Sequence, residues 1–377
     1  MNPLLADIPP SLIRELNARK RPDSIDFGLG EPTFAPELAS FEAAMAWVAA
    51  HGCPYSPNPG FHELREAIAR HYALPDLDRA EHVCVTNGSQ EALYLAIKAL
   101  LAPGTDEVLV VSPSYPLYAK LCQMEGIAVR EVSLSAEDGF RPDAERVLAA
   151  LSPRTRLVVL GSPSNPTGRT WPTAELARLA RGLAARPGQP VWVLSDEVYR
   201  EIYYAPEPPD SIARHYPHAL VANSLSKSNA LTGMRLGWLL GPSEVMAGVI
   251  KVHQFITTAA STFSQRLALA LFQEPGALAR MRERYGPQRA ELLAALERAG
   301  LRHVPPDGAF YCLVRLPDGA PSLETALSIL AEANVVTIPG VAFGAEGWLR
   351  LSFVAPLALI GPGVERMAGA IAARRPA

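Results

Sequence analysis

The sequence predicts an α/β protein in which a large domain, built around a mixed and mostly parallel sheet, is joined to a smaller α+β domain. Short β-rich runs alternate with helical stretches from about residue 80 to residue 245, and this alternation is typical of a doubly wound sheet. After about Glu274 this alternation ends and a long charged helical stretch begins. At 377 residues the chain is also longer than one hydrophobic core usually supports, so we expect two domains.

Six strands are expected in the large domain. Runs such as Val108 to Val111 are continuously apolar, which indicates strands that are buried on both faces of the sheet. Helices follow most of the strands, and the first of these helices, Gln90 to Leu101, is stopped by Pro103-Gly104. The expected strands cover residues 82–86, 108–112, 157–161, 191–195, 219–223 and 237–240.

The C-terminal part has a different pattern. A long charged helix is expected over residues 277–299, closed by Gly300. A strand-like run (309–314), a helix (323–334) and a second strand-like run (348–353) follow it, as in a separate α+β unit. We expect residues 1–40 and 274–377 to form the small domain and residues 41–273 to form the large one.

Composition argues against several classes of partner. The 35 basic and 38 acidic residues are interspersed and give a net charge of −3, so no basic surface for nucleic acid or anionic membrane is indicated. No run approaches the ~18 apolar residues of a membrane span, and the first ten residues, with three prolines, do not fit a signal peptide. The four cysteines lack a CxxC pair, so we expect no metal site and a reducing cytoplasm.

Polar residues follow five of the expected strands. Ligands of open α/β sheets bind outside the carboxyl ends of the strands, so these residues are expected to meet at one edge of the sheet. They are Asn87-Gly88-Ser89-Gln90, Ser114-Tyr115, Asn165-Pro166-Thr167-Gly168, Asp196-Glu197-Val198-Tyr199 and Ser224-Leu225-Ser226-Lys227.

Part of this set suits a phosphate group. The turn at Gly88-Ser89-Gln90 opens a helix, and its N–H groups could hold an anion. Ser224, Ser226 and Arg235 could add hydroxyls and a positive charge. Taken alone, Gly-Ser before a helix is more often a simple helix cap.

Lys227 is the most informative residue, because the chain has only five lysines. A free lysine has a pKa near ~10.4, but desolvation or a nearby cation lowers it enough for a Schiff base to form. Asp196 could pair with a pyridinium nitrogen, Tyr199 and Asn165 could donate to a ring oxygen, and Tyr115 could stack on a ring face. Each residue alone has a structural alternative: a surface lysine, an N-cap or ion pair for Asp196, a turn for Asn165 and core packing for Tyr115.

Arg350 is the one arginine in the apolar run Trp348 to Phe353. The planar fork of a guanidinium is suited to bidentate pairing with a carboxylate, which indicates a substrate-binding residue. The alternative is an arginine on an edge strand, facing water.

Ordered motifs along nearly the whole chain resemble those of the class I/II aminotransferases of pyridoxal-phosphate fold type I, especially the branch with bacterial aspartate-type enzymes. The matching segments are Gly28-Leu29-Gly30-Glu31-Pro32, Tyr55 with Gly60 and Leu64-Arg65, Thr86 to Gln90, Pro113-Ser114-Tyr115, Asn165 to Gly168, Ser195 to Tyr199, Ser224 to Lys227, Gly233 to Gly237, Gly308 to Tyr311 and Arg350 to Phe353.

This resemblance implies that Lys227 carries pyridoxal 5'-phosphate as a Schiff base and moves a proton between substrate and cofactor. It implies that Asp196 faces the pyridine nitrogen, and that Tyr115 covers the ring. Asn165 and Tyr199 would face the ring oxygen. The phosphate would lie among Gly88, Ser89, Gln90, Ser224 and Arg235, and the substrate carboxylate among Arg350, Asn165 and Gly30.

The same resemblance implies a homodimer, in which Tyr55 reaches the phosphate of the neighbouring subunit, and a small domain that closes over an amino acid or 2-oxo acid substrate. Gln90 stands where aspartate-using relatives often have a lysine, so we expect neutral or large amino donors. Arg19, Arg21 and Arg266 are the alternative cations for an acidic side chain.

Two other activities stay open at this point. The fold also carries C–S β-lyases and decarboxylases, which share the early chemistry. A non-catalytic regulator is disfavoured, because Lys227, Asp196 and Arg350 are intact.

Overall fold

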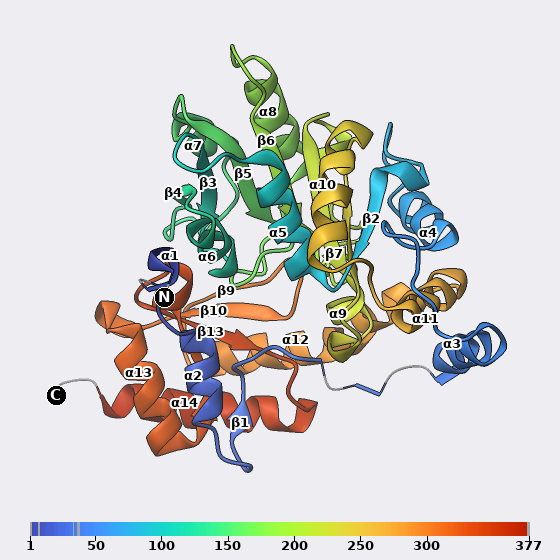
Figure 1. Ribbon diagram of the computed structural model, residues 1–377. Coiled ribbons are helices and arrows are strands. Elements are labelled where there is room, and N and C mark those ends of the chain that lie inside the picture. The colour runs from blue at the N-terminus through green and yellow to red at the C-terminus, as the bar shows by residue number, and fades with distance from the viewer. Residues whose placement is uncertain (1, 7, 33, 36–37, 375–377) are drawn as a thin grey trace.

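The computed structural model describes residues 2–6, 8–32, 34–35 and 38–374. In Figure 1 a large sheet with its helices lies above a smaller sheet with its own helices. The blue segment that includes residues 12–26 runs beside the C-terminal helices (red) in the lower part, so N-terminal and C-terminal segments contribute to the same small-sheet region.

The large sheet has seven strands in the order β2-β8-β7-β6-β5-β3-β4. β8 is antiparallel to both of its neighbours, and the other pairs are parallel, which confirms the expected mixed, mostly parallel sheet. The strands are β2 (Val83–Thr86), β3 (Glu107–Ser112), β4 (Ala128–Ser133), β5 (Thr155–Gly161), β6 (Trp192–Asp196), β7 (Ala219–Ser224) and β8 (Gly237–Leu240).

The six expected strands are all present, with ends that differ by at most two residues from the predicted ones, but β4 was not predicted. β4 pairs only with β3, and Arg130 and Glu131 within it are exposed. Charged residues protect an edge strand from pairing with other chains. The same charged residues interrupt the apolar run in β4, and such runs were the signal that predicted the other strands.

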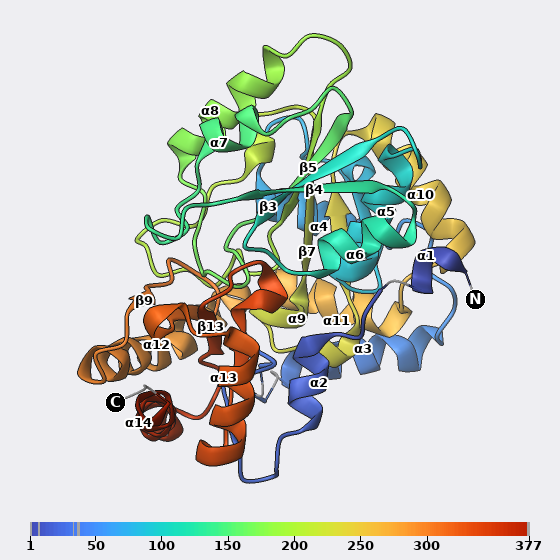
Figure 2. The ribbon, with the colours of Figure 1, turned by 90° about the vertical axis from the view of Figure 1, so that its left-hand side faces the viewer.

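Helices cover both faces of the large sheet (Figure 2). Alternate residues of β5 explain why both faces are covered: Leu157 and Val159 pack into one hydrophobic cluster, and Val158 and Leu160 pack into another. The first cluster includes residues of α5 (Ser89–Leu100), α6 (Leu117–Met124) and α10 (Ser243–Ile256); the second includes residues of α4 (His62–Tyr72), α7 (Ala144–Ala149), α8 (Thr173–Ala184) and α11 (Thr262–Gln273).

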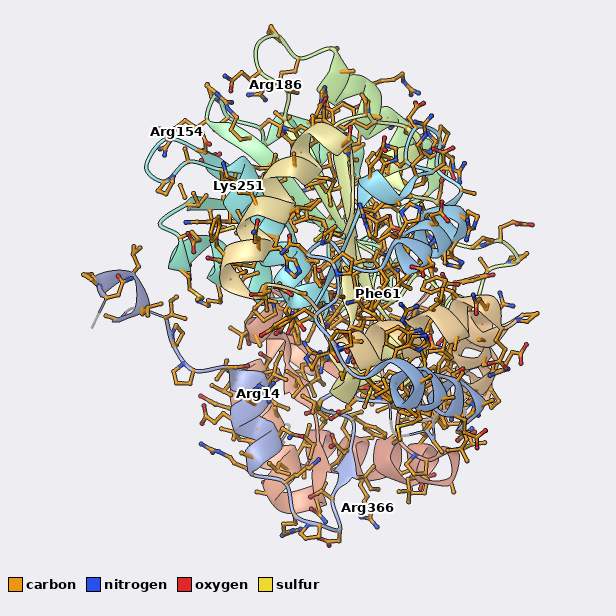
Figure 3. All side chains as sticks on the ribbon, turned by 45° about the vertical axis from the view of Figure 1, so that its right-hand side comes forward. Arg14, Phe61, Arg154, Arg186, Lys251 and Arg366 are labelled. Atoms are coloured by element: carbon orange, nitrogen blue, oxygen red, sulfur yellow. The ribbon has the colours of Figure 1, made fainter. Side chains whose placement is uncertain are left out.

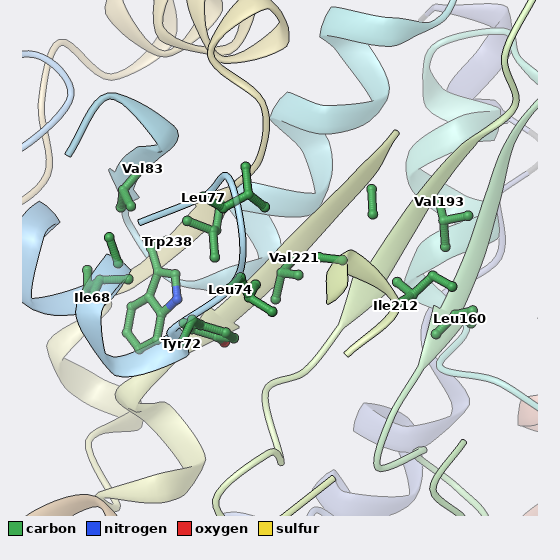
Figure 4. Packing of buried hydrophobic residues seen from close by; sticks show 14 of the residues in the cluster. Ile68, Tyr72, Leu74, Leu77, Val83, Leu160, Val193, Ile212, Val221 and Trp238 are labelled. Atoms are coloured by element: carbon green, nitrogen blue, oxygen red, sulfur yellow. The ribbon is translucent and has the colours of Figure 1, made fainter. Parts of the chain in front are cut away.

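The second cluster is seen from close by in Figure 4, where Ile68 and Tyr72 of α4 lie next to Trp238 of β8 and Val221 of β7. Leu160 continues the same cluster across the sheet. Burying each of these side chains stabilises the fold by about 1.5–3 kcal/mol. The carboxyl ends of the strands are thereby held in fixed positions.

The small-sheet region is an antiparallel sheet in the order β12-β13-β10-β9, flanked by helices. β1 pairs with β11 in parallel, and α2 packs against β12, so these N-terminal elements lie beside the small sheet. Its elements are α2 (Leu12–Ala18), β1 (Ile25–Asp26), α12 (Arg280–Arg298), β9 (His303–Val304), β10 (Tyr311–Arg315), α13 (Ser322–Ser328), β11 (Val335–Val336), β12 (Ile338–Pro339), β13 (Trp348–Ser352) and α14 (Leu357–Ala373).

Several boundaries differ from the predicted ones. The expected helix over residues 277–299 is a short 3-10 turn, Ala277–Ala279, followed by α12. The expected helix over residues 323–334 is α13, continued by a π-helical turn over Ile329–Ala333. It ends at Asn334, whose φ of 54° is left-handed, a conformation that asparagine tolerates better than most residues.

The remaining elements are short or lie at the edges of the molecule. α3 (Leu38–His51) packs on α11, and α1 (Pro3–Ala6) contacts α6. Of the basic residues labelled in Figure 3, Arg14 and Arg366 lie in the lower part of the molecule, and Arg154, Arg186 and Lys251 lie in the upper part. In the described part of the chain, no helix has both the length and the apolar character needed to cross a membrane.

Candidate active site

The carboxyl ends of β5, β6 and β7 face the small-sheet region (Figure 1). Gly28 and Gly30, which follow β1, lie between the two parts of the molecule. The carbonyl oxygen of Gly28 accepts a hydrogen bond from Nη2 of Arg350 on β13. The carbonyl oxygen of Gly30 accepts one from Nζ of Lys227, at 3.0 Å. One short loop therefore joins the two cationic side chains that the sequence singled out.

Lys227 lies in the single-turn helix α9 (Leu225–Ser228), directly after β7. The turn is capped by Ser224, whose hydroxyl accepts from the backbone N–H of Ser226 at 3.3 Å. Burial lowers the pKa of Lys227 to about 8; Glu31 opposes this shift, and the guanidinium groups of Arg350 and Arg235 add to it. An amine with this pKa is a competent nucleophile near neutral pH.

Asp196 ends β6 and is only 6% exposed. Its carboxylate accepts hydrogen bonds from the hydroxyl of Tyr118 at 2.8 Å and from the backbone N–H of Val198 at 3.2 Å. Both donors are neutral, and burial raises the pKa of Asp196 to about 6 although the two bonds oppose the shift. A buried carboxylate of this kind is suited to a cationic group such as a pyridinium nitrogen.

A buried pair of tyrosines lies beside Asp196. The hydroxyls of Tyr199 and Tyr311 are 2.9 Å apart, and burial raises the pKa of Tyr199 well above its usual value. Tyr199 therefore remains a neutral phenol that can donate a hydrogen bond. The guanidinium of Arg350 lies 4.4 Å from the centre of the Tyr311 ring, so Tyr311 links the residue expected at the ring oxygen to the residue expected at the substrate carboxylate.

Arg350 is 1% exposed and lies on β13, between β12 and β10. The alternative of an edge-strand arginine facing water is therefore wrong. Nη1 donates to Oδ1 of Asn165 at 3.0 Å, and Nε is buried without a hydrogen-bond partner in the described part of the chain. An incompletely paired buried guanidinium is suited to a carboxylate ligand.

The turn after β2, where a phosphate is expected, opens a helix. Gly88 is the N-cap of α5 with φ of 89°, and a Cβ at this position would lie 2.6 Å from Nη2 of Arg235. A Cβ on Gly237 would come within 2.7 Å of the backbone N of Ser89. Arg235 is held by the carbonyl oxygens of Thr232 and Asn87, at 3.0 and 3.4 Å. The turn thus combines helix N–H groups with a guanidinium, which is how proteins bind phosphate.

Three other residues predicted for the site make contacts that differ from the predicted ones. Gln90 is exposed, and its side-chain amide donates to the hydroxyl of Tyr115 at 3.2 Å. The backbone N–H of Ser226 takes part in the cap of α9. Tyr55 is 87% exposed, so it is not brought to the site of its own chain.

The three alternative cations for an acidic substrate are engaged elsewhere. Arg19 pairs with Glu15 at 2.6 Å, and Arg21 donates to the side chain of Asn334 at 3.2 Å. Arg266 is stacked between Trp47 and Phe61, at 3.9 and 3.8 Å from their ring centres. None of these contacts brings a guanidinium to Lys227.

Sequence reasoning gave no role to Tyr118 or Tyr311. Tyr118 could have been found, because it lies only three residues after Tyr115 at the start of α6, and the centres of the two rings are 5.9 Å apart. Tyr311 belongs to a quoted motif, but its contact with Tyr199 depends on how β10 meets the end of β6. No local pattern contains that information.

The residues present fit a pyridoxal phosphate cofactor. The turn at Gly88 with Arg235 suits the phosphate, Asp196 the ring nitrogen and Lys227 the aldehyde, and a side chain on Gly88 would fill the space next to Arg235. The mixed α/β fold with this set of side chains at the carboxyl edge of the sheet defines a pyridoxal-phosphate-dependent enzyme.

Comparison with known proteins gives the family. The profile of the family described as "Aminotransferase class I and II" matches residues 22–359, and the chain belongs to this family. It is 36% identical to the aspartate/prephenate aminotransferase of Thermus thermophilus, over 93% of this chain and 91% of that protein. It is 33% identical to the probable N-acetyl-LL-diaminopimelate aminotransferase of Bacillus subtilis, over 97% of this chain and 94% of that protein.

The structure agrees with the sequence comparison. An aspartate aminotransferase from Thermus thermophilus, solved with maleate, superposes with a TM-score of 0.91 at 34% identity, covering 98% of this chain and 99% of that chain. The protein is therefore a pyridoxal-phosphate-dependent aminotransferase. This confirms the aminotransferase activity that the resemblance implied.

Proposed function

We propose that this aminotransferase moves the amino group of a neutral or bulky α-amino acid to a 2-oxo acid, with Lys227 and Arg350 at the centre of the site. The observation that carries the proposal is the shared loop: Gly30 contacts the buried lysine and Gly28 contacts the buried arginine. A substrate whose carboxylate is held by Arg350 would therefore have its Cα close to the amine of Lys227.

Each side chain has a separate task. When bound, pyridoxal phosphate supplies an electron-withdrawing ring on which the amino group is carried. Lys227 accepts and returns the proton at the substrate Cα, which its lowered pKa permits. Asp196 keeps a proton on the ring nitrogen, and Tyr199 donates to the ring oxygen. Arg350 fixes the substrate carboxylate, together with Asn165, so that the Cα–H bond is correctly oriented.

The charges around the site support an amino-acid substrate with a neutral or large side chain. Gln90 and Tyr115, which stand by the phosphate turn, are both neutral and are hydrogen-bonded to each other. Arg19, Arg21 and Arg266 are committed to other partners. Burying a second carboxylate without a cation would cost several kcal/mol, so aspartate is proposed to be a poor donor.

A homodimer is proposed from the exposed apolar surface. Tyr55 is 87% exposed, and Phe255 and Ile256 at the end of α10 are 79% and 49% exposed. The side chain of Asn58 donates to the carbonyl oxygen of Thr258, so the Tyr55 segment lies next to the end of α10. Exposed apolar side chains that gather in one patch indicate an interaction surface. In the proposed dimer, Tyr55 reaches the phosphate of the partner subunit.

The domain limits and the compartment are also proposals. Residues 1–40 and 274–377 are taken as the small domain and residues 41–273 as the large domain; pairing of β1 with β11 supports this division. The small domain would close over substrate. The four cysteines are free thiols, which supports the reducing cytoplasm.

Half-reactions test the activity. The cofactor-loaded enzyme is mixed with one amino acid at a time, and the spectrum of the cofactor is followed. We expect conversion to the amine form by neutral and large amino acids, and recovery of the aldehyde form when a 2-oxo acid is added. Release of ammonia from cysteine conjugates without formation of the amine form would indicate a β-lyase instead.

Subunit mixing tests the role of Tyr55. Tyr55→Ala and Lys227→Ala variants are each expected to have little activity. A mixed dimer would contain one complete site, made of Lys227 from one subunit and Tyr55 from the other, so exchange of subunits should restore part of the activity. Absence of any recovery in verified mixed dimers would contradict a contribution across the interface.

A further inference from the structure

A carboxylate lies directly behind the phosphate turn. Glu91, in the first turn of α5, accepts two hydrogen bonds from Asn87: one from its backbone N–H at 2.5 Å and one from its side-chain amide at 3.0 Å. The carbonyl oxygen of Asn87 accepts from Nη2 of Arg235 at 3.4 Å. Asn87, the residue immediately before Gly88, is thus held by Glu91 on one side and by Arg235 on the other.

Glu91 is itself held by α10. Its second carboxylate oxygen accepts from Nδ1 of His253 at 3.1 Å and from the hydroxyl of Thr257. His253 has no solvent exposure, and this bond requires the tautomer with a proton on Nδ1. Burial by itself would raise the pKa of Glu91, but the hydrogen bonds from His253, Thr257 and Asn87 hold the pKa below its usual value. The side chain is therefore a fixed, charged carboxylate.

This carboxylate cannot be a phosphate ligand, because two anions repel each other. Its contacts indicate another use. Gly88 has φ of 89°. Glycine adopts positive and negative φ values about equally well, so the backbone of the turn does not by itself fix the direction of its N–H groups. A phosphate gains full affinity only from donors that are already aligned.

We infer that Glu91 is a positioning residue for the cofactor phosphate: held by His253 and Thr257, it fixes Asn87 and thereby aligns the N–H groups of the turn at Gly88 and Ser89. The inference rests on the proposed cofactor site. According to this inference, α10 influences the affinity for the phosphate through Glu91, without contacting the phosphate itself.

The test compares pyridoxal phosphate with pyridoxal, which lacks the phosphate but keeps the ring and the aldehyde. The dissociation constants of both are measured on the cofactor-free full chain from the absorbance of the bound aldehyde. For Glu91→Gln we expect binding of pyridoxal phosphate to weaken by about tenfold, the lower end of what one hydrogen bond to a charged group contributes, with binding of pyridoxal changed by less than about twofold.

Two further variants make the comparison specific. Thr257→Val removes one donor to Glu91 without changing any charge; Thr257 is exposed, so this variant is expected to fold and to show a smaller change in the same direction. Glu125→Gln is the matched control, because Glu125 is also a carboxylate that accepts two side-chain hydrogen bonds, from Tyr94 at 2.9 Å and from Lys98 at 2.6 Å, and neither donor belongs to the phosphate turn. It should leave both dissociation constants unchanged.

The outcomes separate the inference from the proposed function. If Glu91→Gln weakens the binding of pyridoxal phosphate and of pyridoxal equally, or weakens neither, the positioning role is wrong. Should that variant fail to fold, Thr257→Val decides in its place by the same ratio. Failure of the wild-type chain to bind pyridoxal phosphate at Lys227 would instead contradict the proposed cofactor site.

Discussion

The hydroxyl of Tyr118 donates a 2.8 Å hydrogen bond to Oδ2 of Asp196, and both side chains are buried. Asp196 ends β6, whereas Tyr118 lies on α6, which follows β3, and β5 runs between these two strands. The bond opposes the increase of the Asp196 pKa that burial causes. Tyr118 therefore helps to keep this carboxylate charged near neutral pH.

Replacing Tyr118 by phenylalanine should raise the pKa of Asp196 further. In the wild-type chain, cofactor affinity is expected to fall as the pH drops through about 6, because protonated Asp196 no longer stabilises a pyridinium. In Tyr118→Phe that fall should begin at a higher pH. Dissociation constants between pH 5 and 8 measure the shift. Tyr94→Phe is the control, because Tyr94 donates to Glu125 outside the site; an unchanged pH profile in Tyr118→Phe would contradict the role of the bond.

Asp196→Asn should separate stability from activity. The pKa of Asp196 rises from 3.8 to about 6 on folding, so the stability that its protonated form contributes is lost as the pH rises through about 6. At pH 7 the cofactor-free variant should be more stable than wild type, by on the order of 3 kcal/mol. Turnover should fall at least about a hundredfold, because the ring is no longer kept protonated. Denaturant unfolding and kcat measure the two effects, and near-normal turnover at full cofactor occupancy would exclude this role.

Cofactor incorporation should follow the titration of Lys227. Its pKa is lowered to about 8, and only the neutral amine attacks an aldehyde, so the association rate should rise with pH with a midpoint near 8. Stopped-flow mixing of the cofactor-free protein with pyridoxal phosphate between pH 6.5 and 10 gives this midpoint. Reduction with borohydride followed by peptide mapping should place the adduct on Lys227. An adduct on the exposed Lys251 would refute the assignment of the whole site.

Arg350→Lys should raise KM strongly and also lower kcat. A lysine is a point charge and cannot make the bidentate contact that fixes the substrate carboxylate, nor can it keep both bonds, to Asn165 and Gly28. A loss of about a hundredfold in kcat/KM is expected. Arg315→Lys on the neighbouring strand β10 is the control, since Arg315 is partly exposed and pairs with Glu137. Equal kinetics for Arg350→Lys and wild type would move the carboxylate site elsewhere.

Gln90→Lys should improve the use of aspartate. In wild type we expect kcat/KM for aspartate to lie below the values for alanine, leucine, phenylalanine and an acylated diamino acid, with 2-oxoglutarate as acceptor. A lysine next to Tyr115 would supply the missing cation and should raise the value for aspartate relative to leucine by about tenfold. Gln123→Lys, an equal change of charge on the surface at the end of α6, should not. A tenfold lead of aspartate over every neutral donor in wild type would disprove the proposed preference.

Continuous apolar runs made the buried strands predictable. β5 and β3 were found because side chains on both of their faces are apolar, as a sheet covered on both sides requires. β4 has Arg130 and Glu131 exposed, and its place at the edge of the sheet is set by pairing with β3. Pairing partners are a property of the folded chain, so the local pattern of this segment gave no signal.

Residue types and their spacing after buried strands predicted the family, the mixed and mostly parallel sheet, and Lys227, Asp196 and Arg350 as candidate site residues, because these patterns are local. The neighbours that these residues contact depend on how the whole chain folds, so no local pattern predicted them. Tyr118 reaches Asp196, Tyr311 reaches Tyr199, and Glu91 is held by His253. These contacts join residues 78, 112 and 162 positions apart in the chain, and packing of helices against the sheet brings such residues together.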